Sequence, residues 1–389
     1  MRILLCSLFR PSADDGVSAS TAQLVAALRL KGLFVDVATT DWGWGKNELS
    51  SVLDGVKVFP ATWNNNFEFS PALLRHLRNA CAGYDLIHFN SVYSFATVLG
   101  SAIARDLGKP YIVSPRGNYI PGPRASKAGV KSVLRKQLFF SLLARRSLTK
   151  ADLILCTSSL EAERIAVYVP GGKIAHIPNG MHCCAPDIMD ADRIILDRLR
   201  ITGESQIYLF LGRLAEEKGL PFLLDVWESI SGGLPDAVLV IGGVGEHGIA
   251  KILEKKISRL KEPHSVIMPG KIEGNLKAAL LKRSRCLLLP SFYESFGNVV
   301  LEALSSGTPV IASTGTPWRA LDDNRLGRCL PRDLNAWASA MVSMSGDSLY
   351  KTPEFVERSC KWVASNFSWP IIAEKYVQMY QRVVNDHSY

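Results

Sequence analysis

The stretch PSFYESFGNVVLEALSSGTPVIAS, residues 290–313, leads from the end of one predicted strand through a helix to a second strand. The apolar run CLLLP at 286–290 precedes it and ends in proline, which is typical of a short strand buried on both faces. The segment from Asn298 has helical apolar spacing up to Gly307, a residue type that commonly ends a helix. TPVIAS at 308–313 is the next apolar strand. This order of strand, helix and strand predicts a parallel sheet with a crossover helix.

The same alternation runs along the whole chain. The apolar runs that predict strands are RILLCSLF, LFVDVAT, DLIHF, PYIVS and DLILCTS before residue 160, and IYLFLG, AVLVIGG, SVIMPG, RCLLLP and TPVIAS after residue 205. Between these two groups, IPNGMHCCAPDIMDADR near 177–193 breaks the alternation. We therefore predict an α/β fold made of two Rossmann-like, doubly wound parallel-sheet domains.

The composition is that of a large protein with two cores. At 389 residues the chain is longer than a domain with a single hydrophobic core, and its 47% of hydrophobic residues are enough to fill two cores. Its eight cysteines show no C-x-x-C spacing, which indicates reduced thiols and argues against a zinc site. The N-terminal run MRILLCSLF is too short for a signal peptide, and no run approaches the ~18–20 apolar residues that cross a bilayer. We expect a cytoplasmic protein whose membrane contacts are peripheral.

Two glutamates in the opening stretch lie eight residues apart, at 294 and 302. Backbone amides from Gly297 onward would lie at a helix N-terminus, which favours an anion such as a diphosphate. A carboxylate is a poor phosphate ligand, so Glu294 and Glu302 are better assigned to vicinal hydroxyl groups. This pattern predicts a ligand with both phosphate and diol groups. The alternative is that Glu294 only favours the helix dipole and Glu302 is a solvated helix residue.

A second segment, YLFLGRLAEEKGL at 208–220, is an apolar strand followed by a charged loop. The guanidinium of Arg213 and the ammonium of Lys218 could neutralise a diphosphate leaving group and stabilise its developing charge. The alternative is a salt-bridged loop, because Glu216 and Glu217 lie between the two cations.

These two segments resemble the signature elements of the retaining glycosyltransferases of family 4. They are E-x7-E at 294–302 and G-R-x4-K-G at 212–219. The resemblance extends over nearly the whole chain and implies the GT-B fold, in which two Rossmann-like domains face a cleft. It implies that Glu294 contacts the donor sugar and Glu302 the ribose. It also implies that Arg213 and Lys218 hold the diphosphate.

The resemblance implies catalysis by front-face substitution, in which the leaving diphosphate accepts the proton of the acceptor hydroxyl. Glu294, Arg213 and Lys218 are the predicted catalytic residues. No metal ion and no cofactor are implied, since the nucleotide-diphosphate sugar is the donor substrate. The predicted donor-binding residues are Glu302, Gly16, Gly243, Phe296, Gly297 and Asn298.

The domain limits also follow from the resemblance, because the turn I-P-N-G marks the end of the first domain in this family. We expect an acceptor-side domain at 1–180, a linker at 181–204 and a nucleotide-sugar-binding domain at 205–368. The helical segment at 369–389 is expected to cross back to the first domain.

The first domain matches the family pattern more loosely. Gly16 is the one glycine in RPSADDGVSAS, where the family often has paired glycines. DLIHFN keeps His88 of an H-x-H element but has Asn90 at its second position, and SPRGNY has Arg116 where histidine commonly stands. His88, Asn90 and Arg116 are the acceptor-side candidates. Arginine cannot act as a base, but it could bind a sugar hydroxyl or a phosphate on the acceptor.

Two further motifs predict other chemistry and are discounted. Gly243, Gly245 and Gly248 spell G-x-G-x-x-G after a strand, but the acidic residue that a dinucleotide site needs ~20 positions later is missing from SVIMPG. We predict instead that this turn lets the backbone approach the donor. Asp190 and Asp192 spell the metal-binding D-x-D, but they lie in the predicted linker, and we interpret them as solvated.

Residues 86–151 contain eleven basic residues and one acidic residue, Asp106. Apolar residues recur among the cations at helical spacing, at Val130, Val133, Leu134, Leu138 and Leu142. The basic segment 124–150 therefore predicts contact with an anionic membrane surface. The alternative is that the apolar stripe packs on the sheet and the cations are solvated. Nucleic acid is not an expected partner, because no recognition motif or aromatic platform accompanies the charge.

Together these observations predict a transferase that moves a sugar from a nucleotide-diphosphate donor to a hydroxyl of a glycan or polyprenyl-diphosphate-linked glycan. The expected setting is bacterial surface polysaccharide synthesis, in the cytoplasm or at the inner face of its membrane. Two alternatives are a sugar-nucleotide epimerase of GT-B architecture and a non-catalytic nucleotide-sugar-binding protein.

Overall fold

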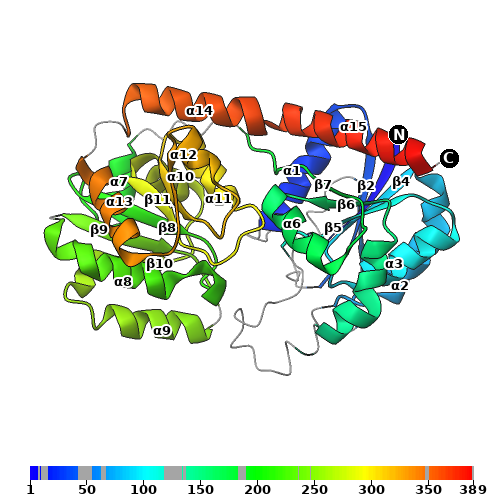
Figure 1. Cartoon of the computed structure of the whole chain (residues 1–389), viewed down its shortest axis with the longest axis horizontal. Helices are drawn as coiled ribbons and strands as arrows, with labels where there is room; N and C mark the ends of the chain where they lie inside the picture. The colour runs from blue at the N-terminus through cyan, green and yellow to red at the C-terminus, as the bar shows by residue number, and fades with distance from the viewer. Residues whose placement is uncertain are drawn as a thin grey trace. The chain divides into compact units, whose positions relative to one another are not determined.

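The chain folds into two compact units (Figure 1). Unit 1 contains Met1–Gly180 together with Trp369–Tyr389, and unit 2 contains Met181–Ser368. The computed structural model describes residues 1–7, 9, 16–42, 55–62, 67–117, 134, 137–182, 190–234, 236–245, 247–346 and 350–387. None of the described helices is long and apolar enough to cross a membrane.

Unit 1 is built on a parallel sheet with the strand order β3-β2-β1-β4-β5-β6-β7. The strands are β1 Arg2–Ser7, β2 Phe34–Thr40, β3 Val56–Phe59, β4 Leu86–Asn90, β5 Tyr111–Ser114, β6 Leu153–Cys156 and β7 Ile174–His176. Leu4 of β1 lies opposite Asp36 of β2 on one side and opposite Ile87 of β4 on the other. The strand order therefore reverses between β1 and β4.

Helices cover both faces of the unit 1 sheet. Successive residues of β1 point to opposite faces, so that Leu4 packs with Leu77 and Val98 while Ile3 and Leu5 pack on the other side. The helices of the first face are α2 Pro71–Ala80, α3 Phe95–Asp106, the π-helical turn η3 Phe140–Ala144, α5 Arg145–Thr149 and α6 Ser159–Tyr168. The helices of the second face are α1 Gly16–Leu30 and α15 Trp369–His387, which lie side by side in Figure 1.

The C-terminal helix α15 is an integral part of unit 1. Trp369 Nε1 donates to Gln23 Oε1 on α1 at 3.0 Å, and Lys31 pairs with Glu374 at 2.9 Å. Tyr376 and Tyr380 are buried against the sheet. The second face of the unit 1 core is thus completed by the last segment of the chain.

Unit 2 is built on a parallel sheet with the order β10-β9-β8-β11-β12-β13. The strands are β8 Gln206–Leu211, β9 Ala237–Gly242, β10 Val266–Gly270, β11 Cys286–Leu289, β12 Val310–Ser313 and β13 Gly327–Leu330. One face is covered by α8 Leu220–Ile230, α9 His247–Ile257 and α13 Leu334–Gly346. The other is covered by α7 Ala191–Leu199, α10 Gly274–Arg283, α11 Asn298–Ser305, α12 Ala320–Asp323 and α14 Pro353–Phe367.

The ten predicted strands are all present, and the predicted fold class of two Rossmann-like parallel-sheet domains is confirmed. Residues 181–204, expected as a linker, include α7, which packs on α10 within unit 2. The six described cysteines are unpaired, while Cys183 and Cys184 lie outside the described residues.

Candidate active site

The strand order of unit 2 reverses between β8 and β11, and two charged loops follow these neighbouring strands. Ligands of open α/β sheets bind at the carboxyl ends of the strands at such a reversal. The two loops are in contact, because Phe292 N donates to Glu217 O at 2.7 Å. Gly219 has a φ of +69°, and a Cβ there would lie 2.3 Å from Pro290 O. The contact between the loops therefore requires glycine at this position.

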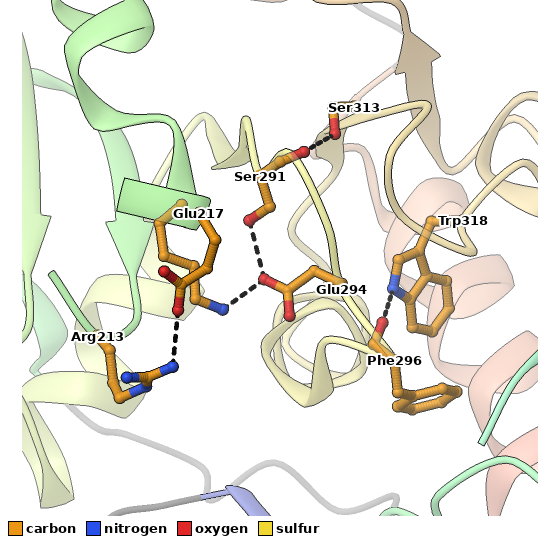
Figure 2. A network of polar contacts seen from close by, with 8 residues as sticks. Arg213, Glu217, Ser291, Glu294, Phe296, Ser313 and Trp318 are labelled. Carbon is orange, nitrogen blue, oxygen red and sulfur yellow. Dashed lines mark hydrogen bonds and ion pairs between the residues drawn. The ribbon is translucent and has the colours of Figure 1, made fainter. Parts of the chain in front are cut away.

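Glu294 is held at the centre of this edge by two donors (Figure 2). Lys218 Nζ lies 2.5 Å and Ser291 Oγ lies 2.8 Å from the same carboxylate oxygen, Oε1. Ser291 is fully buried, and the side chains of Lys218 and Glu294 are only 16% and 11% exposed. The second oxygen, Oε2, has no hydrogen-bond partner among the described residues and can accept one from a ligand. Glu294 thus does more than favour a helix dipole.

The loop that contains Glu294 is braced by the end of β12. Ser313 Oγ donates to Ser291 O, as Figure 2 shows. Glu294 N lies 3.4 Å from Gly315 O, and a Cβ on Gly315 would lie 2.4 Å from Phe292 O. Ser313 and Gly315 were not among the predicted site residues, and both contact the backbone of the loop that carries Glu294.

Gly297 is the N-cap of α11; it has a φ of +87° and provides no capping side chain. A Cβ there would lie 3.3 Å from Trp318 Nε1, the atom that donates to Phe296 O at 2.5 Å. Phe296 packs in the core against Trp318 and Phe367. The side chain of Phe296 is buried and its carbonyl accepts from Trp318, so Phe296 positions this loop, and its role in donor binding stays a prediction. Asn298 is the first residue of α11.

Glu302 lies further along α11 and is bound by a lysine that the sequence did not single out. Lys277 Nζ of α10 lies 2.8 Å from both Oε1 and Oε2 of Glu302. The two side chains are 35% and 25% exposed, so the pair is partly shielded from solvent. Glu302 is therefore not a free, solvated helix residue. No spacing rule links positions 277 and 302, so the pair could not be found before the two helices were placed.

Arg213 forms the exposed part of this edge. Its Nη2 lies 2.8 Å from Glu217 Oε1, and its side chain is 70% exposed. This half of the loop matches the salt-bridge alternative, whereas Lys218 reaches across to Glu294 instead. An exposed ion pair contributes only about 0–1 kcal/mol, so an anionic ligand could displace Glu217 from Arg213 at little cost.

The glycines of the G-x-G-x-x-G motif let two loops pack closely. Gly243 has a φ of +151°, and a Cβ there would lie 1.8 Å from Gly212 O. A Cβ on Gly245 would lie 2.0 Å from Leu214 O, but Gly248 has nothing within 4 Å. Gly243 and Gly245 therefore hold the end of β9 against the loop that carries Arg213.

In unit 1, His88 is fully buried and both of its ring nitrogens have partners. Nδ1 lies 2.8 Å from Tyr380 Oη on α15, and Nε2 lies 2.7 Å from Ser114 Oγ. Burial, and then the positive charge of Arg116, lower the pKa of His88 to about 3, so its ring is neutral. His88 was expected on the acceptor side, and this is corrected: it anchors α15 to the sheet and is not accessible to an acceptor.

Asn90 and Arg116 are brought together at the strand reversal of unit 1. Arg116 Nε lies 3.4 Å from Asn90 Oδ1, and Nη1 lies 2.7 Å from Asn179 Oδ1. Asn90 is also buried and donates to Ser7 Oγ at 3.4 Å and Thr21 Oγ1 at 3.3 Å. Arg116 is partly exposed, whereas Asn90 holds its guanidinium in place. Gly16 is the first residue of α1.

The D-x-D aspartates lie on the surface of unit 2. Asp192 Oδ1 accepts from Arg283 Nε at 2.6 Å, and Asp190 lies 4.0 Å from Arg193. Their side chains are more than half exposed. Within the described part of the chain, no group of three or more His, Cys, Asp or Glu side chains is placed to hold a metal ion.

Two family models match the chain in succession. The model described as Glycosyltransferase Family 4 matches residues 15–183, and the model described as Glycosyl transferases group 1 matches residues 192–323. The first match covers unit 1 from residue 15 up to Gly180 and the first three residues of unit 2, and the second lies in unit 2, where it includes the loops of Lys218 and Glu294. The chain belongs to the family 4 glycosyltransferases.

Curated relatives of this family 4 member include glycogen synthase of Mycobacterium tuberculosis, which is 30% identical over 237 residues. That match covers 59% of the chain and 53% of the relative, so it spans about half of the relative's length. GDP-mannose:cellobiosyl-diphosphopolyprenol alpha-mannosyltransferase of Xanthomonas campestris is 24% identical over 93% of the chain and 89% of its own length.

Solved structures of the same fold cover nearly the whole chain. Anabaena HepE in complex with UDP and glucose has a TM-score of 0.75 at 19% identity, covering 98% of this chain and 100% of its own. Sucrose-phosphate synthase from Thermosynechococcus elongatus has a TM-score of 0.75 at 22% identity and covers 99% of each chain. These neighbours confirm the GT-B fold of this family member.

Proposed function

We propose that this protein is a retaining, metal-independent glycosyltransferase that moves a sugar from a nucleotide-diphosphate donor to a glycan or polyprenyl-diphosphate-linked glycan. The observation that supports the proposal most is the buried group of Glu294, Lys218 and Ser291 at the strand reversal of unit 2. It combines a carboxylate oxygen that can accept from a sugar hydroxyl with an ammonium that can bind a phosphate.

In this proposal Lys218 and Glu294 remain in contact during the reaction and bind different parts of the same donor. An ammonium has three donors, so Lys218 can keep one on Glu294 Oε1 and direct others to the diphosphate. Arg213 adds a second positive charge, and the first turn of α11 adds its amides. Glu294 Oε2 accepts from a hydroxyl of the donor sugar, and Glu302 accepts from the ribose. This arrangement orients the anomeric carbon and stabilises the charge of the leaving group.

The proposed chemistry is a front-face substitution. The bond between the anomeric carbon and the diphosphate oxygen breaks, and the acceptor oxygen forms its bond on the same face. The acceptor proton goes to the departing diphosphate oxygen, whose negative charge Arg213 and Lys218 stabilise. The anomeric configuration of the sugar is therefore retained.

The acceptor class is proposed from the relatives and from charge. The full-length relative from Xanthomonas campestris is named for a GDP-mannose donor and a diphosphopolyprenol acceptor, and a relative from Komagataeibacter xylinus has the same name. The HepE structure was determined with UDP and glucose. We propose that this chain works at the inner face of a bacterial cytoplasmic membrane, in surface polysaccharide synthesis, with Arg116 on the acceptor side.

The first test is a screen of the purified protein against UDP-, GDP-, ADP- and dTDP-sugars by thermal shift and by release of nucleoside diphosphate. We expect one donor to stabilise the protein and to be hydrolysed slowly. Glu294→Gln should lose both effects, whereas Asp225→Asn, which removes an ion pair with Lys256 elsewhere in unit 2, should keep them. Release of an epimerised nucleotide sugar without acceptor would identify an epimerase instead, and tight binding without turnover, even with acceptors present, would identify a binding protein.

A further inference from the structure

The helical segment that spans η3 and α5 is apolar on two faces, and only one of them packs on the protein. Phe140, Ala144 and Leu148, each four residues apart, are buried in the core of unit 1. Their row is the face that contacts α3 and the sheet. A surface helix normally presents polar residues on the opposite side.

On this helix the opposite side begins with leucines. Leu134, Leu138 and Leu142 are 53%, 51% and 74% exposed, and each is four residues from the next. Continuing at the same spacing, Arg146 and Lys150 are exposed as well. Side chains four residues apart form a ridge along a helix, as Leu138, Leu142, Arg146 and Lys150 do, and Leu134 lies N-terminal to this described run. We call these five residues the leucine–cation ridge.

The sequence alone left open whether the leucines pack on the sheet, and the structure answers this question. Leu134, Leu138 and Leu142 do not enter the core, which is filled by the row of Phe140 instead. Val130, Val133 and the cations at 124, 127, 131, 135 and 136 lie outside the described residues.

We propose that the leucine–cation ridge docks on an anionic lipid bilayer. The three leucines would enter the boundary between headgroups and acyl chains, and Arg146 and Lys150, with Arg145 beside them, would meet lipid phosphates. None of these three cations forms an ion pair with a described residue, and residues 107–151 contain no acidic side chain to repel the lipids. Large apolar side chains next to unpaired cations match the chemistry of an anionic membrane surface.

The choice of a bilayer over an acidic protein rests in part on the proposed function, because a polyprenyl-linked acceptor is itself embedded in the membrane. The order along the ridge agrees with this choice. The leucines and the cations follow one another along the same face of the helix, so the leucine end can enter the acyl boundary while the cationic end stays at headgroup level.

The test is flotation of the full chain with vesicles of neutral phosphatidylcholine, and with vesicles that contain 30% phosphatidylglycerol, at low salt. We expect binding only to the anionic vesicles. Leu138→Gln with Leu142→Gln should weaken it by about tenfold or more, because both side chains are exposed and their main loss is apolar burial in lipid. Arg146→Gln with Lys150→Gln should weaken it by roughly 25-fold at low salt, and should reduce its dependence on salt.

The controls are matched for exposure within unit 1. Val167→Gln replaces an apolar side chain that is 76% exposed on α6, and Lys375→Gln removes an exposed cation on α15. Both variants should float as the wild type does. Equal flotation of the ridge variants and the controls would overturn the proposal. So would the absence of wild-type flotation at low salt, even if the ridge were found to bind an acidic protein.

Flotation needs neither donor nor acceptor, so its outcome is independent of the proposed transferase reaction. Hydrolysis of the nucleotide sugar in solution should be unchanged in the ridge variants. Failure of hydrolysis with intact flotation would reject the transferase, and the reverse result would reject the docking surface.

Discussion

The two units share one strand order up to their sixth strand, but they carry different chemistry at the point where that order reverses. At the reversal in unit 2, Lys218, Glu294, Arg213 and Glu302 form ion pairs that are partly open to solvent. At the reversal in unit 1, buried Asn90 donates to the hydroxyl groups of Ser7 and Thr21 and accepts from Arg116.

The difference teaches that topology provides a place for a ligand, but the side chains decide whether a ligand can enter. The ion pairs in unit 2 retain atoms that can form hydrogen bonds with a ligand, such as Glu294 Oε2 and the remaining protons of Lys218. His88 and Asn90 in unit 1 have used their polar atoms to fix strands and α15. The reversal of unit 2 is therefore suited to binding a charged ligand, whereas His88 and Asn90 of unit 1 hold the strands, α15 and Arg116 in place.

The largest effect should come from Lys218→Met. Without the ammonium, the leaving diphosphate loses a charge-assisted donor, and kcat for sugar transfer should fall by about 10²–10³. The measurement is steady-state transfer with the donor found in the screen, alongside circular dichroism to verify the fold. Lys256→Met, which breaks an ion pair with Asp225, is the control and should keep its activity. A decrease in kcat of less than threefold in Lys218→Met would contradict the proposed role of Lys218 in stabilising the leaving diphosphate.

The second prediction concerns His88, which is buried in unit 1. Folded His88 stays neutral down to about pH 4, because its pKa is lowered to about 3, whereas unfolded His88 takes up a proton as the pH falls through about 6.5. The unfolded state therefore binds more protons in this window, and the contribution of His88 to the free energy of unfolding decreases by at most about 1.4 kcal/mol per pH unit. Urea unfolding at pH 7, 6, 5 and 4 would measure the slope.

His88→Gln is the matched variant, because an amide can still donate and accept but does not titrate. Its stability should depend less on pH than that of the wild type between pH 6 and pH 4, even if it is lower at pH 7. Parallel slopes in the two proteins would show that His88 is not neutral and buried.

A smaller effect is expected at Lys277, which contacts both carboxylate oxygens of Glu302. If Glu302 accepts hydrogen bonds from the ribose, Lys277→Met should leave its carboxylate poorly oriented and weaken nucleotide binding by about tenfold. Calorimetry should compare binding of a nucleoside diphosphate with binding of its 2′,3′-dideoxy analogue. This comparison distinguishes the orientation of Glu302 from the loss of the positive charge of Lys277. Only the ribonucleotide should be weakened by the variant, and equal weakening of both ligands would reject the positioning role.

The smallest effect is expected at the exposed pair of Arg213 and Glu217. Glu217→Gln should change the free energy of unfolding by less than about 1 kcal/mol, because exposed ion pairs are weak. The same variant frees Arg213 for the donor, so the KM for the nucleotide sugar should stay the same or decrease. A clear increase in KM would show that Glu217 itself takes part in donor binding.

The sequence by itself determined the two parallel sheets and the loops that bear Arg213, Lys218 and Glu294. Buried parallel strands are continuous apolar runs, so ten of them can be recognised locally, and the charged residues follow them directly. The strands that escaped prediction, β3, β7 and β13, lie at sheet edges and are only partly buried, which weakens their apolar signal.

Only the tertiary structure decided which side chains meet. Lys218 and Glu294 are 76 residues apart in the chain, and His88 and Tyr380 are 292 apart. The sequence predicted His88 as an acceptor contact and favoured a membrane contact for the leucines at 134, 138 and 142, with packing on the sheet as the alternative. In the structure His88 is buried and the three leucines are exposed. The physical reason is that periodicity is a local property, while burial and ion pairing depend on which distant segments pack together.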